Sequence, residues 1–125
     1  MSSKVQDIRI VNVTCPDVET ARKIGRLAVD RRLVACVNIF PGVQSIYRWM
    51  GEVCEDDEVF VSMKTREEFV ESLFTAIVAN HPYPQPAIEV LAVDSVGRGV
   101  AAWIKAETGG EATVSLPKGF KGAED

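Results

Sequence analysis

The chain has 125 residues, of which 46% are hydrophobic and 26% charged, and this balance predicts one soluble globular domain rather than a disordered segment. The net charge of −4 argues against a nucleic-acid partner, because phosphate binding needs clustered Lys and Arg. No apolar run approaches the ~20 residues that span a bilayer, and the odd count of three cysteines indicates free thiols and a cytoplasmic location.

The first two predicted elements are a strand and a helix. The segment Asp7–Val13 carries apolar residues at alternate positions, which is typical of a strand. Pro16 suits the first position of a helix, and the acidic residues after it favour the positive end of the helix dipole. Apolar residues at helical spacing extend this predicted helix from Pro16 to Arg31.

The segment Leu33–Thr65 is rich in β-branched and aromatic residues. It predicts two unusually long strands joined as a hairpin around Trp49–Glu55. Pro41 and Gly42 interrupt the first of these strands and indicate a bend or bulge there. Cys36 lies in an apolar run and is expected to be a small core residue.

A second helix is expected after the hairpin. Thr65 and Glu68 match a capping box, in which the threonine oxygen accepts a backbone N–H and the glutamate reaches back. Asn80, which tolerates a left-handed turn, is the predicted last residue, because Pro82 forbids continuation of the helix. A buried strand is then predicted over Pro86–Val93.

A short helix over Arg98–Thr108 completes the order β-α-β-β-α-β-α. Two right-handed crossovers that pack both longer helices on one face of an antiparallel sheet predict a ferredoxin-like α+β fold with strand order 4-1-3-2. We expect one domain over residues 1–108 and a loosely held tail over residues 109–125. In this topology Cys15, the hairpin tip and His81–Pro86 share one end of the sheet.

Four motifs carry a resemblance to a known family: "ACVNIFPGVQSIYRWMGEV", then "KT" at Lys64 and Thr65, then "HPYPQPAIEVLAV", then "AAWI". In this order and at these separations, over roughly Ile10 to Glu107, they resemble the CutA-type divalent-cation tolerance proteins. The resemblance implies a ferredoxin-like fold and a tightly interlocked homotrimer similar to the PII signalling proteins. It also implies a cytoplasmic location in bacteria, an association with copper and other divalent cations, and no established enzymatic activity.

The chain departs from the family pattern at several positions. Members with a proposed copper site have two adjacent histidines, and here Asn80 stands at the first while His81 matches the second. Val13 stands where the family cysteine aligns, although Cys15 lies two residues further on. Val100 replaces a tyrosine that is frequent in the family. The resemblance therefore implies a weakened metal site.

His81 is the only histidine of the chain, and Cys15 is its candidate partner as a metal ligand. One imidazole and one thiolate make a weak site, because strong copper or zinc sites use three or four ligands. We therefore expect weak binding of copper or another divalent cation that folding does not require. The alternative is that His81 shapes a rigid loop by bonding to backbone. The same pair is the one candidate for thiol–imidazole catalysis, but no third orienting residue accompanies it.

Tyr47 and Trp49 alternate on one face of the long strand and are predicted to lie in the homotrimer interface. One of them alternatively packs against the last helix, near Trp103. The acidic run Glu52 and Glu55–Glu58 lacks the Asp-x-Asp-x-Gly order of a calcium loop and is more typical of a solvated hairpin tip.

These patterns together predict a non-enzymatic, trimeric, PII-like divalent-cation tolerance protein with no nucleic-acid or membrane partner. The alternative hypothesis is a trimeric regulatory or adaptor protein. It would bind a small ligand or a protein in the clefts between subunits and use no physiological metal.

Overall fold

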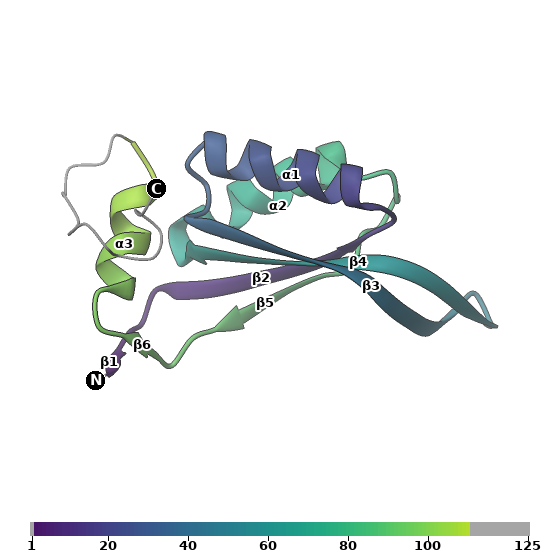
Figure 1. Ribbon diagram of the computed structural model, residues 1–125, viewed down its shortest axis with the longest axis horizontal. Helices are drawn as coiled ribbons and strands as arrows, with labels where there is room; N and C mark the ends of the chain where they lie inside the picture. Colours follow the sequence, from purple (N-terminus) through teal and green to yellow (C-terminus); the bar gives the residue numbers. More distant parts are fainter. Residues whose placement is uncertain (1, 111–125) are drawn as a thin grey trace.

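The computed structural model describes residues 2–110 (Figure 1). The four strands of the main sheet, two main helices and several shorter elements follow one another along the chain. Their bounds are β1 Ser2–Lys4, β2 Ile8–Cys15, α1 Val18–Asp30, β3 Cys36–Trp49, β4 Glu52–Arg66, a 3-10 turn η1 Glu67–Phe69, α2 Val70–Asn80, β5 Ile88–Ala92, β6 Ser95–Gly97 and α3 Val100–Glu107.

The main sheet has four strands in the order β3-β4-β2-β5, and every neighbouring pair is antiparallel. This is the predicted order 4-1-3-2 read from the other edge, so the ferredoxin-like fold is confirmed. Helices α1 and α2 lie side by side on one face of the sheet (Figure 1). The antiparallel pair β1–β6 was not predicted, because three-residue strands are too short to show a periodicity.

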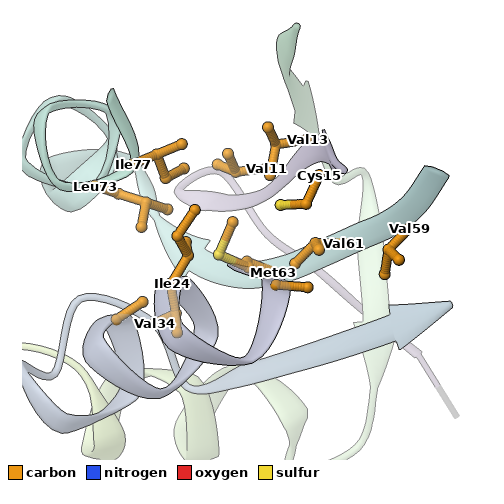
Figure 2. Packing of buried hydrophobic residues seen from close by; sticks show 12 residues of the cluster. Val11, Val13, Cys15, Ile24, Val34, Val59, Val61, Met63, Leu73 and Ile77 are labelled. Atoms are coloured by element: carbon orange, nitrogen blue, oxygen red, sulfur yellow. The ribbon is translucent and has the colours of Figure 1, made fainter. Parts of the chain in front are cut away.

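The core lies between the sheet and the two helices. Ile24 of α1 and Leu73 and Ile77 of α2 point toward the buried face of β2 and β4 (Figure 2). Burying such side chains is the main favourable term in folding, at about 25 cal/mol per Å² of apolar surface. The strand residues of this cluster are Val11, Val13, Cys15, Val59, Val61 and Met63.

The start of α1 differs from the prediction. The helix begins at Val18 rather than at Pro16, because Asp17 is its N-cap. The Asp17 side chain accepts a hydrogen bond of 2.7 Å from the Thr20 backbone N–H, which satisfies one of the unpaired donors of the first turn.

The predicted capping box at Thr65 is wrong. Thr65 still belongs to β4, is completely buried, and donates its hydroxyl to the Leu33 carbonyl at 2.6 Å. A 3-10 turn precedes α2, whose start has no side-chain cap. The pairing of β4 with β2 therefore continues through Thr65, although the local sequence there favours the start of a helix.

Helix α2 ends at Asn80 as predicted, but without a left-handed turn. His81 follows in extended conformation, with φ −101° and ψ 137°. Asn80 remains helical and donates its side-chain amide to the Ala76 carbonyl at 2.8 Å. Pro82 explains this geometry, because a residue before proline is pushed out of the helical region.

The hairpin of β3 and β4 is longer and tighter than predicted. Its strands reach Trp49 and Glu52, so the turn is only Met50 and Gly51. Both turn residues have positive φ, 51° and 84°, as a two-residue type I′ turn requires. The predicted bulge is confirmed by a register shift between Phe40 and Val43. The hairpin projects as an arm well beyond the helices (Figure 1).

Two residue environments were predicted wrongly. Strand β5 is not buried: it is an edge strand on which Val90 and Leu91 are exposed. Cys36 is only half-buried, at the start of the other edge strand. An edge strand has a neighbour on one side only, so less of its surface is covered within one chain.

Helix α3 is tied to the rest of the domain by two arginines. Arg32 donates to the carbonyls of Ala106 and Gly109 at 2.6 and 2.7 Å, and Arg66 donates to the Thr108 hydroxyl at 2.9 Å. Cations at a helix C-terminus stabilise its unpaired carbonyls. Residues 111–125 of the predicted tail lie outside the described residues.

Candidate functional site

His81 lies at the end of the sheet where the topology predicted it. The residue is buried, with 8% of its surface exposed. The Nε2 atom lies 2.8 Å from the Thr14 carbonyl oxygen, and Nδ1 accepts a hydrogen bond of 3.1 Å from the Tyr83 backbone N–H. Because Nδ1 must accept, Nε2 carries the proton and donates it, which defines a neutral tautomer. Both nitrogens of the imidazole are thus bonded to backbone.

The sequence around His81 explains this placement. Pro82 ends α2 and turns the chain toward β5, and Pro84 and Pro86 stiffen the connection. Since β2 ends at this side of the sheet and β5 begins here, the carbonyl of Thr14 comes within reach of the imidazole.

Cys15, the last residue of β2, is completely buried in the core cluster. Burial raises the pKa of its thiol to about 11, and the negative charges of Asp17 and Glu58 act in the same direction. The thiol is therefore protonated at neutral pH. This form is neither the nucleophile nor the metal ligand that cysteine chemistry requires.

Glu58 and Tyr83 are site residues that the sequence analysis missed. Glu58 was interpreted as part of a solvated hairpin tip, which is wrong, because it is only 8% exposed. Its carboxylate accepts a hydrogen bond of 3.1 Å from the Tyr83 hydroxyl. Burial, and then this bond, raise the pKa of Tyr83 to about 12. The Tyr83 ring also lies 4.7 Å from that of His81, centroid to centroid.

No local signal identifies Glu58. From Val59 onward, β4 alternates buried and half-buried residues, and Glu58 precedes that pattern on the acidic run. Its bonding partner lies 25 residues further along the chain. One sequence feature indicates the contact between Tyr83 and Glu58: the prolines after α2, which turn the loop back toward the sheet.

The site does not form a closed metal centre. Within residues 2–110, no group of three or more His, Cys, Asp or Glu side chains is arranged to hold a metal ion. Both nitrogens of His81 are already bonded, and the Cys15 thiol is buried and protonated. The donor set therefore does not fit a tight copper or zinc site, which needs three or four free ligands. The same bonds leave no imidazole nitrogen to activate the thiol.

Two acidic side chains of the arm are bonded across the hairpin. Asp56 accepts a hydrogen bond from the Tyr47 hydroxyl, and Asp57 accepts one from the Gln44 amide. The bond to Asp56 raises the pKa of Tyr47 above its usual range. These contacts hold the two strands of the arm together near its tip.

The predicted interface residues lie on this arm. Tyr47 and Trp49 are 41% and 51% exposed, and Ile46 and Val53 beside them are still more exposed. Helix α3 lies at the opposite end of the molecule from the Met50–Gly51 turn (Figure 1), so neither aromatic packs against it. Among residues 2–110, nothing covers the apolar surface of the arm.

Comparison with known proteins places this fold and these motifs in a family. The sequence profile of the CutA1 divalent ion tolerance proteins matches residues 9–107. The chain belongs to the CutA1 family. The divalent-cation tolerance protein CutA of Thermus thermophilus is 42% identical over 100 residues, which make up 80% of this chain and 97% of that protein.

A plant relative and a solved structure extend this comparison. The chloroplastic CutA of Arabidopsis thaliana is 36% identical over 107 residues, but those cover 86% of this chain and 59% of the plant protein. The solved structure of the Thermus thermophilus CutA1 superimposes with a TM-score of 0.80 at 41% identity, covering 82% of this chain and 99% of that one. CutA1 proteins are thus similar to this chain in sequence and in fold.

The helices of the described part of the chain are not of the membrane-spanning kind. None of the helices between residues 2 and 110 has both the length and the apolar character to cross a bilayer.

Proposed function

We propose that this CutA1 protein is a non-enzymatic, cytoplasmic homotrimer similar to the PII proteins, which binds divalent cations weakly. The observation that carries the proposal is the uncovered apolar surface of the β3–β4 arm. The location is supported by the three cysteines, all of them free thiols.

The arm supports a subunit interface on energetic grounds. Ile46, Trp49 and Val53 are more than half exposed, on an arm that extends beyond the two helices (Figure 1). Exposed apolar patches rimmed by polar groups usually mark protein contacts, and aromatic residues are enriched in interface cores. Tyr47 and Trp49 are therefore proposed as interface anchors, and the exposed apolar residues of β5 offer a second edge for such a contact.

The metal part of the proposal rests on His81 and Cys15, which lie where β2 ends and β5 begins. A copper ion or another divalent cation would have to displace the bond from His81 to Thr14 or to Tyr83, and would have to deprotonate a buried thiol. Both costs weaken binding. The same observation favours the second candidate function, a trimeric adaptor that binds a small ligand or a protein between its subunits without a physiological metal.

Light scattering tests the trimer. We expect a mass of about three times 13.7 kDa at micromolar concentration. Trp49→Asp should shift this mass toward the monomer, because it puts a charge in the proposed contact. Phe74→Asp is the matched control, since Phe74 is a similarly exposed aromatic residue, at 45%, on α2. A monomeric wild-type protein, or equal effects of the two substitutions, would reject the interface.

Calorimetric titration with Cu²⁺ tests the metal site. We expect a dissociation constant of about 1 μM or weaker, lost in Cys15→Ser and in His81→Ala. The apparent affinity should rise with pH, because the Cys15 thiol must lose a proton and its pKa is raised to about 11. Nanomolar binding with integral stoichiometry would show that the site is tighter than proposed. Binding unchanged in both variants would leave the adaptor function as the better explanation.

A further inference from the structure

A row of polar side chains crosses the face of the sheet that helices α1 and α2 leave uncovered (Figure 1). Asn38 of β3 pairs with Ser62 of β4, and Ser62 pairs with Asn12 of β2. Asn12 pairs in turn with Glu89 of β5. Residues that pair directly across an antiparallel sheet point to the same face. The residues before and after Asn12 and Ser62 belong to the core beneath the helices, so the row points away from the helices.

The row lies between apolar side chains. Phe40 and Phe60, whose ring centroids are 5.9 Å apart, pair on one side of it, and Ile10 and Leu91 pair on the other. Phe40 is 51% exposed and Leu91 46%. An exposed surface that combines apolar and polar side chains in this way is typical of a contact with another protein. The row therefore lies within a surface that suits burial.

The two ends of the row carry opposite charges. Lys64 lies two residues after Ser62 on the same face of β4 and donates to the side-chain oxygen of Asn38 at 3.0 Å. Glu89 stands at the other end, on β5. Within residues 2–110 neither Lys64 nor Glu89 forms an ion pair. The β3–β4 end of the row thus presents an ammonium group and the β5 end presents a carboxylate, each without a partner of opposite charge.

The middle of the row lacks a hydrogen-bond donor. The side-chain oxygen of Asn12 is buried and has no hydrogen-bond partner, and it is the one such side-chain atom between residues 2 and 110. Buried polar atoms of folded proteins are bonded in the great majority of cases, because an unpaired one costs free energy. The missing donor therefore points to a group outside these residues.

We propose that the uncovered sheet faces of adjacent copies meet in the trimer, and that Lys64 of one copy pairs with Glu89 of the next. This pairing rests on the trimer proposed above and names the groups that align its subunits. In a closed ring of three, each copy contacts its two neighbours through two different patches. A row with opposite charges at its two ends meets this requirement, because the Lys64 end of one copy fits the Glu89 end of the next.

The pair acts on the alignment of the subunits more than on their affinity. An ion pair gains little when both charges leave water, but a misaligned contact would bury either charge alone, which is costly. The same contact supplies the Asn12 oxygen with a donor, since Asn12 and Glu89 are neighbours across β2 and β5. The apolar side chains on both sides of the row exclude water from the pair, which strengthens it.

Exchanging the two charges tests the proposal. Sedimentation at one fixed urea concentration gives the protein concentration at which half of the trimer has dissociated. Glu89→Lys and Lys64→Glu each place like charges in the contact, so each should raise this concentration about 10-fold or more. The exchanged variant Lys64→Glu/Glu89→Lys restores opposite charges and should return it to within about 3-fold of the wild-type value.

Two control variants change the same charges on the other side of the sheet. Glu19→Lys and Lys23→Glu lie on the exposed surface of α1 and should leave the half-dissociation concentration unchanged. The proposal is wrong if the single variants have no effect, if the exchanged variant is as weak as they are, or if the controls weaken the trimer equally. Any of these results with a trimeric wild type rejects the charge pairing alone, whereas a monomeric wild type rejects the proposed trimer and the pairing together.

Discussion

Replacing Ile77 with alanine is expected to lower the free energy of unfolding by about 2–5 kcal/mol. Ile77 is completely buried and points from α2 into the cluster that includes Leu73 and Val11 (Figure 2). The substitution removes three buried carbon atoms and leaves a cavity that two packed layers cannot easily close. Denaturant unfolding at a fixed protein concentration measures the loss, because assembly makes stability depend on concentration.

The control for this prediction is Val78→Ala on the next residue of the same helix. Val78 is 39% exposed, and its truncation should cost well under the loss at Ile77, about 0.5 kcal/mol. Equal losses at Ile77 and Val78 would contradict the arrangement of α2, since they would mean that both side chains are covered to the same extent.

The second large effect is expected at His81. His81→Ala should lower the free energy of unfolding by about 2–4 kcal/mol, because it leaves the Thr14 carbonyl and the Tyr83 N–H without their partner at a buried position. If His81 were held in place by a metal ion instead, removing metal from the wild type would produce a similar loss. Unfolding of the wild type with and without a chelator separates these two causes.

Two amide variants refine the His81 prediction. His81→Gln retains a donor that can reach Thr14, and His81→Asn retains an acceptor close to the Tyr83 N–H, so each should recover part of the stability. A loss in either variant as large as in His81→Ala would show that the two hydrogen bonds contribute little, and that the ring contact with Tyr83 matters instead.

The buried thiol of Cys15 and the hydrogen-bonded imidazole of His81 limit how well this family member can bind a metal ion. The two residues lie at the same end of the sheet, as the topology predicts, but the end of β2 is packed so closely that the thiol is buried and its pKa is raised. Asn80, in the position of the first family histidine, uses its side chain to bond the Ala76 carbonyl within α2. The pair is therefore proposed as a weak site, and the titration above decides its role.

The fold could be predicted from the sequence, because it depends on local patterns. Alternating apolar residues define β2, helical spacing defines α1, and the proline after His81 ends α2. The handedness of crossover connections then leaves one strand order, which is the order observed. The tight turn at Met50 and Gly51 lay within the predicted hairpin tip, although its length did not follow from composition.

The environment of individual side chains could not be predicted in this way. Thr65 reads as a helix cap, but the pairing of β4 with β2 keeps it in a strand, where its hydroxyl bonds Leu33, 32 residues away. Glu58 reads as a solvated charge, but Tyr83 reaches it across the end of the sheet. His81 finds its partner at Thr14, 67 residues earlier in the chain. Such contacts depend on which distant segments meet, and that information is absent from any short stretch of sequence.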